Sequence, residues 1–82
     1  MNYCSYIIKS GKTSKYYIGS CGDIDKRLQR HNAGMTKSTK NGVPWKLVCV
    51  EEFETRQDAC RRERQVKSYK GGNAFKKLID NL

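Results

Sequence analysis

Glu63 is the residue whose place in the sequence most clearly needs a chemical explanation. It falls between Ala59 and Val66, so a helix through this segment would put its carboxylate on an apolar stripe. A carboxylate that faces a core is costly unless it is paired, protonated or bound to a cation. The simpler interpretation is an ion pair with a basic residue of the same helix, namely Arg62, Lys67 or Lys70.

Arg27 and His31 form a second group of side chains with useful chemistry. They are four residues apart, so they lie on one side of a helix, next to the apolar positions Ile24 and Leu28. Both side chains are therefore expected to point toward the edge of a sheet. The simpler interpretation is that Arg27 is a solvated cation and His31 a hydrogen-bonded residue at the boundary of the core.

Tyrosine is frequent for so short a chain, with five among 82 residues. Alternation along a strand puts Tyr6 and Ile8 on one face of a first strand, and Tyr17 and Gly19 on one face of a second. Gly19 is expected to clear space beside Tyr17, which indicates either a close approach to the backbone or a bulge. Because tyrosines in sheets more often pack than catalyse, packing is the alternative for both rings.

The segments that must position these side chains have the patterns of three strands and three helices. They are strands at 3–9 and 15–20, a helix at 24–32, a strand at 45–53, a helix from 55 to about 69, and a short helix at 73–82. Residues 35–44 are expected to form a loop. The order ββαβαα, with the first two strands joined as a hairpin, predicts a small three-stranded antiparallel sheet flanked by helices, in the α+β class.

The third strand is expected to have something to bury on both faces. One face would carry Trp45, Leu47, Cys49 and Phe53, and the other Val48 and Val50. This pattern predicts a sheet that is covered on both sides.

Length and charge limit the class of protein. With 82 residues the chain is expected to be one domain, 1–82, because chains divide into two only well above ~200 residues. Its 17 Lys and Arg against 8 Asp and Glu give a net charge of +9, which makes a polyanion the expected partner, nucleic acid before membrane. No apolar run is long enough for a membrane span and no secretory signal is recognisable, so a cytoplasmic location is expected.

The four cysteines do not indicate a zinc finger. The gaps between them fit no Cys-x-x-Cys pair, and the single histidine has no partner at metal-ligand spacing. In a chain without an export signal they are expected to be reduced thiols that mostly fill the core.

The order of several short motifs resembles that of a known family. The motifs are Ser5-Tyr6-Ile7, Tyr17-Ile18-Gly19, Arg27 and Ala59-x-x-x-Glu63. Together they resemble the GIY-YIG endonuclease domain, and His31-Asn32-Ala33-Gly34 and Pro44-Trp45 resemble its small stand-alone members. The first tripeptide departs from Gly-Ile-Tyr and keeps only the tyrosine.

The resemblance implies hydrolysis of DNA phosphodiester bonds. A sheet tyrosine would activate water, an arginine on the following helix would contact the phosphate, and the helix glutamate would hold one Mg²⁺ or Mn²⁺. In this sequence these residues are Tyr17 with Tyr6, Arg27 and Glu63, and the resemblance makes His31 a second base or phosphate donor. A guanidinium and a divalent cation can together stabilise the charge that gathers on an attacked phosphate.

The DNA is expected to be held through its phosphates by Arg30, Lys37, Lys40 and the basic face of the second long helix. Affinity should then fall steeply with salt, and sequence selectivity should be low. A second hypothesis is a non-catalytic, basic nucleic-acid-binding module of the same fold. A third is a small protein that docks on RNA by stacking bases on solvent-facing tyrosines.

Overall fold

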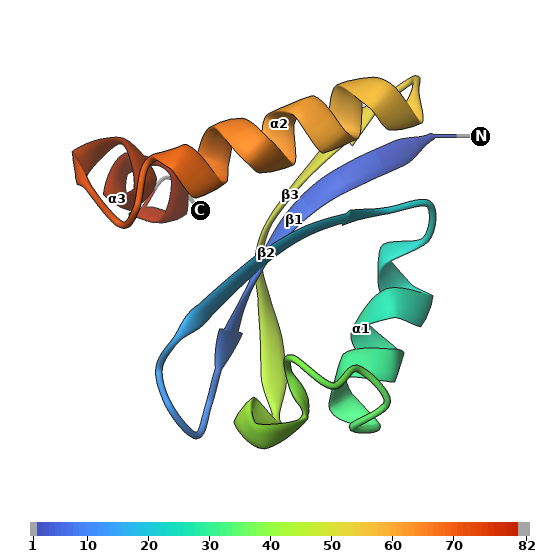
Figure 1. Ribbon diagram of the computed structural model, residues 1–82, viewed down its shortest axis with the longest axis vertical. Helices are drawn as coiled ribbons and strands as arrows, with labels where there is room; N and C mark the ends of the chain where they lie inside the picture. Colours follow the sequence, from blue (N-terminus) through green and yellow to red (C-terminus); the bar gives the residue numbers. More distant parts are fainter. Residues whose placement is uncertain (1, 81–82) are drawn as a thin grey trace.

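A three-stranded antiparallel sheet forms the centre of the computed structural model, which describes residues 2–80 (Figure 1). The strands are β1 (Tyr3–Ser10), β2 (Tyr16–Cys21) and β3 (Trp45–Phe53), in the spatial order β2-β1-β3. β1 is the central strand and is buried continuously from residue 4 to residue 8, as expected where both neighbours and both faces are covered. The predicted hairpin is confirmed with bounds that differ by one residue, and the third strand has the predicted bounds.

The helices are α1 (Ile24–Asn32), α2 (Arg56–Ser68) and α3 (Asn73–Asp80), and a single 3-10 turn at Lys40–Gly42 interrupts the predicted loop. Asp23 and Thr55 begin α1 and α2 by accepting hydrogen bonds from the backbone N–H groups three residues later. Gly34, with φ +73°, follows the end of α1. The terminal helix was expected to reach residue 82, and its last two residues lie outside the described part of the chain. No helix within residues 2–80 combines the length and the hydropathy of a membrane span.

The helices cover opposite faces of the sheet (Figure 1). On the face under α1, Tyr6 and Ile8 pack with Trp45, Leu28 and other apolar side chains. On the face under α2 and α3, a second core gathers Ile7, Cys49, Val66 and Phe75. The prediction of a sheet covered on both sides is confirmed, as is the order ββαβαα of the α+β class.

The predicted alternation of β3 holds for Leu47 and Val48, which lie on opposite faces, and is wrong from Cys49 onward. Ile7 and Ile8 are neighbours in β1, but their partners are Cys49 and Leu47, so Val48 is an extra residue in β3. Such a bulge reverses the face on which the following residues lie. Leu47 therefore packs in the core under α1, whereas Cys49 packs in the core under α2 and α3.

Candidate active site

Tyr6 lies in the central strand and points into the core under α1. Tyr6 is only 2% exposed, and its hydroxyl oxygen is 2.9 Å from Nε2 of His31. Burial, together with the nearby Tyr17, raises the pKa of Tyr6 above its ordinary value, although the charge of Arg27 opposes the shift. The hydroxyl therefore keeps its proton at neutral pH. A ring buried in this way cannot stack on a nucleic-acid base, contrary to what RNA docking through Tyr6 would require.

Gly19 makes room for the Tyr6 hydroxyl. The two residues are direct partners in the pairing of β1 with β2, and a Cβ atom at residue 19 would lie 2.5 Å from the hydroxyl oxygen and 2.7 Å from Cζ. The sequence indicated a close approach to the backbone here and placed it beside Tyr17. The neighbouring strand supplies Tyr6 instead, because a residue directly opposite in the paired strand lies closer than the residue two positions along the same strand, which is the next one on that face.

His31, expected at the boundary of the core, is completely buried. Besides the contact of Nε2 with Tyr6, its Nδ1 lies 2.7 Å from Oγ1 of Thr39. Burial lowers the pKa of His31 below its ordinary value, and the positive charges of Arg27 and Arg30 on the same helix lower it further. The imidazole is therefore neutral at pH 7, so it can accept a proton.

Tyr17 completes an aromatic cluster with these two residues. Its ring centroid lies 6.5 Å from that of Tyr6 and 5.2 Å from that of His31, with the His31 ring packed edge-on. Tyr17 is more exposed than Tyr6. The cluster thus has a buried side, formed by Tyr6 and His31, and a more open side formed by Tyr17.

Arg27 connects this cluster to the other side of the sheet. Its charge acts on the pKa of both Tyr6 and His31. Its side chain also lines a cavity of about 260 Å³ between the end of β2 and α2, together with Ser20, Arg56 and Ala59. Two guanidinium groups in one cavity suit an anion, because each offers a planar set of donors.

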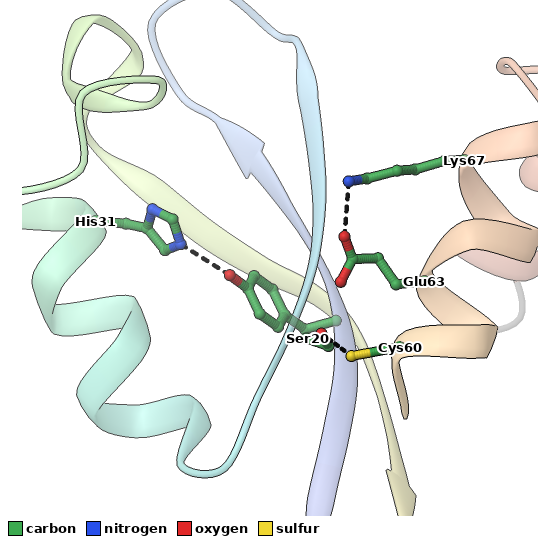
Figure 2. Close-up of polar contacts among 6 residues, drawn as sticks. Ser20, His31, Cys60, Glu63 and Lys67 are labelled. Carbon is green, nitrogen blue, oxygen red and sulfur yellow. Dashed lines mark hydrogen bonds and ion pairs between the residues drawn. The ribbon is translucent and has the colours of Figure 1, made fainter. Parts of the chain in front are cut away.

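Glu63 lies on α2, across the edge strand β2 from the aromatic cluster. Figure 2 shows His31 extending from α1 on one side of the strands, and Glu63 and Lys67 extending from α2 on the other. Nζ of Lys67 is 2.7 Å from Oε2 of Glu63, which confirms an ion pair within the helix. Burial by itself would raise the pKa of Glu63, but the hydrogen bonds from Lys67 and Ser20 outweigh it and lower the pKa.

The donors around Glu63 fit a metal ion that keeps most of its water. Its carboxylate is ionised at neutral pH, and residues 2–80 contain no group of three or more His, Cys, Asp or Glu side chains that could hold a metal. Mg²⁺ retains several waters and takes only one or two protein carboxylates, so a single glutamate is compatible with it. Lys67 would have to leave one carboxylate oxygen when a cation binds.

The structure thus brings Tyr6, Tyr17 and His31 into one cluster, with Arg27 at its border. Glu63 does not join it by any hydrogen bond or ion pair within residues 2–80, although its charge raises the pKa of Tyr6. The remaining expected residues are exposed: Arg30 in the last turn of α1, and Lys37 and Lys40 in the segment that follows.

Thr39 and Ser20 are the polar residues near the site that sequence reasoning did not select. Thr39 contacts His31, and Ser20 contributes to the low pKa of Glu63. Thr39 lies in a loop, where no periodicity reveals which side chain turns inward. Ser20 alternates with Gly19 in β2, and this alternation is the signal that could have placed it on the face of α2.

Comparisons with known proteins identify the family of this chain. A family model described as the GIY-YIG catalytic domain matches residues 2–76. A UPF0213 protein of Staphylococcus saprophyticus is 40% identical over 65 residues, which are 78% of this chain and 78% of that protein. The structure-specific endonuclease subunit slx1 of Schizosaccharomyces pombe is 41% identical over 54 residues, 58% of this chain and 20% of that protein.

A solved structure extends the similarity to the fold. The solution NMR structure of a UPF0213 protein from Bacillus halodurans matches with a TM-score of 0.61 and 28% identity, over 98% of this chain and 84% of that one. Since the family model spans all of the sheet and nearly all of the helical residues, the chain belongs to the GIY-YIG family and carries its nuclease domain.

Proposed function

We propose that this chain is a metal-dependent endonuclease that hydrolyses DNA phosphodiester bonds, with residues 1–82 acting as one nuclease domain. The observation that carries the proposal is the cluster of Tyr6, Tyr17 and His31, with Arg27 at its border and Glu63 across the edge strand. In this reaction a water oxygen forms a bond to phosphorus, one P–O bond of the backbone breaks, and the leaving oxygen takes up a proton.

Tyr6 and His31 are proposed to accept the proton of the attacking water as a unit. The raised pKa of Tyr6 keeps the phenol protonated at neutral pH, so this side chain needs a partner that takes its proton before it can act as a base. A neutral imidazole 2.9 Å away can take the phenol proton while the phenol oxygen takes one from the water. Tyr17, on the more open side of the cluster, is proposed to orient the water or the phosphate.

Arg27 and Glu63 are proposed to act on the phosphate from the two sides of β2. The guanidinium of Arg27 would pair with phosphate oxygens and stabilise the charge that develops on them. Glu63 is the residue that would hold Mg²⁺ or Mn²⁺, and a divalent cation bound there would add further positive charge next to the phosphate.

DNA is proposed to bind through its phosphates, with contacts from Arg30, Lys37 and Lys40. These exposed cations lie on α1 and on the segment after it, the same part of the molecule that supplies His31. Phosphate contacts carry no base information, so sequence selectivity would be low. The similar protein of Schizosaccharomyces pombe is a structure-specific endonuclease subunit, so DNAs of different structure are compared in the test.

The test is cleavage of supercoiled plasmid and of labelled linear and branched DNA, with Mg²⁺ and with a chelator. Glu63→Gln and Arg27→Ala should lower the cleavage rate by about 10²-fold or more, since each removes a charge that acts on the transition state. The matched control is Glu54→Gln, which removes the same charge from an exposed position and should leave cleavage unchanged. Equal cleavage by wild type and Glu63→Gln, or full cleavage in chelator, would contradict the proposal.

Binding measured in chelator separates this function from a non-catalytic nucleic-acid-binding module. The endonuclease hypothesis expects Glu63→Gln to bind DNA about as well as wild type while failing to cut it. A module without catalysis would bind all of these DNAs and cut none. Labelled RNA of the same sequence, run in parallel, shows which nucleic acid is preferred.

A further inference from the structure

Thr39 is buried on the side of the His31 imidazole that faces away from Tyr6, next to Nδ1. It is 1% exposed, and its Oγ1 lies 2.7 Å from Nδ1 of His31. Its backbone is held on both sides, because Thr39 N–H donates to the carbonyl of Thr36 and the Trp45 indole N–H donates to the carbonyl of Thr39 at 2.7 Å. The hydroxyl therefore has a fixed place relative to the imidazole, although it comes from a loop.

The two neutral forms of His31 differ in whether every proton along the contacts from Tyr6 through His31 to Thr39 has an acceptor. If Nδ1 carries the proton, it can donate to Thr39 Oγ1, the Thr39 hydroxyl can donate to the Thr36 carbonyl at 3.4 Å, and the Tyr6 hydroxyl can donate to Nε2. All three protons then have acceptors. If Nε2 carries the proton, it donates to the Tyr6 oxygen, and the Tyr6 hydroxyl proton has no acceptor within residues 2–80.

We propose that Thr39 is a positioning residue that holds the proton of neutral His31 on Nδ1 and so leaves Nε2 bare to accept the proton of Tyr6. The nitrogen of a histidine that carries the proton is set by the hydrogen bond the other nitrogen makes. The other charged or titratable groups around the ring are Arg27 and Arg30 from α1, Tyr6 from β1 and Tyr17 from β2. Within residues 2–80 the hydrogen-bond partner of Nδ1 is the neutral hydroxyl of Thr39 and not a carboxylate.

The catalytic part of this inference rests on the proposed function, whereas the position of the proton does not. With the proton on Nδ1, Tyr6 can pass its proton to His31 while it accepts one from water. With the proton on Nε2, His31 would donate to the Tyr6 oxygen, and Tyr6 could not pass its own proton to His31.

The decisive experiment is imidazole ¹⁵N NMR of the free protein near neutral pH. His31 is the single histidine of the chain, so its two nitrogen signals need no assignment among several residues. We expect wild type to show a protonated Nδ1 and an unprotonated Nε2. A protonated Nε2 in wild type would overturn the inference, and this measurement needs neither DNA nor activity.

Two variants test whether Thr39 is the cause. Thr39→Val keeps the branched shape and removes the hydroxyl, so we expect the proton to move toward Nε2, whereas Thr39→Ser should restore the wild-type spectrum. Thr36→Val is the matched control, because Thr36 contributes its carbonyl and not its side chain. An unchanged proton position in Thr39→Val would overturn the inference.

Cleavage by the same proteins adds the functional readout. Thr39→Val should lower the cleavage rate by about 10- to 100-fold, as the loss of an orienting partner of histidine does at other sites, and Thr39→Ser should recover most of it. If wild type cleaves no nucleic acid, the proposed function fails while the NMR result still decides where the proton lies. Full cleavage by Thr39→Val despite a displaced proton would overturn the positioning role.

Discussion

The hydroxyl of Tyr6 occupies the space that a side chain at Gly19 would need. The two residues face each other across β1 and β2, and a Cβ atom at residue 19 would come within 2.5 Å of the phenol oxygen. Because the Tyr6 ring is 2% exposed and its hydroxyl is bonded to His31, the ring cannot simply swing away. The absence of a side chain at Gly19, in the edge strand β2, is thus part of what positions the Tyr6–His31 pair.

Gly19→Ala should therefore both destabilise the protein and displace Tyr6. Overpacking of this kind costs about 1–3 kcal/mol, measurable by chemical denaturation. Cleavage should fall together with stability, because the displaced phenol loses its geometry with His31. Gly22→Ala is the control, since its Cβ would come no closer than 3.8 Å to Tyr3. A Gly19→Ala protein with wild-type stability would show that the clash is relieved elsewhere.

Stability should fall as the pH drops through the ordinary titration range of histidine. The pKa of His31 is lowered by burial below its ordinary value of 6.5, so in that range the unfolded chain binds a proton that the folded chain does not. The free energy of unfolding should decrease below about pH 6.5 by at most about 1.4 kcal/mol per pH unit, until the folded protein is protonated too. Above that range the two states have the same charge at this residue.

His31→Gln removes this titration and should flatten the pH dependence of unfolding between about pH 7.5 and 5.5. The contribution of Glu63 lies lower, because a carboxylate with a lowered pKa stabilises the fold above its ordinary value of 4.5 and loses this as the pH falls further. An equally steep dependence in His31→Gln would assign the effect to another group.

Lys67→Met should strengthen binding of a divalent cation at Glu63. The ammonium of Lys67 occupies one carboxylate oxygen at 2.7 Å and is itself half exposed. Ion pairs of this exposure contribute about 0.2–1 kcal/mol, so the dissociation constant for Mg²⁺ or Mn²⁺ should fall by up to about fivefold. Calorimetric titration of the free protein measures this, with Lys77→Met on α3 as the control. Unchanged or weaker binding would indicate that Glu63 is not the ligand.

Lys37→Ala and Lys40→Ala should each weaken DNA binding and lower its dependence on salt. A lost phosphate contact reduces the slope of log affinity against log salt concentration by about 1, whatever the DNA sequence. Fluorescence anisotropy in chelator at several salt concentrations gives both quantities. Lys76→Ala is the matched control, because Lys76 is exposed on α3, which covers the opposite face of the sheet from α1. Equal slopes for all three variants would place the DNA elsewhere.

The elements of this fold could be predicted from the sequence because each depends on neighbours within one turn or one strand. Asp23 and Thr55 cap their helices through groups three residues away, and Ala59 and Val66 share one face of α2 at helical spacing. The unusual place of Glu63 was visible for the same reason, and the structure finds it paired with Lys67, one turn further on. Local periodicity is sufficient for contacts of this range.

Contacts between elements were decided only by the tertiary structure. Tyr6 and His31 are 25 residues apart, and their meeting depends on how α1 lies on the sheet. The partner of Gly19 depends on strand register, and the faces on which the residues of β3 lie depend on a bulge at Val48. The contact of Thr39 with His31 depends on the packing of a loop. Periodicity shows which residues share a face of one strand or helix but carries no information on what another element places against that face. The residue types of the site are therefore determined by the sequence alone, whereas their partners are determined by register and packing.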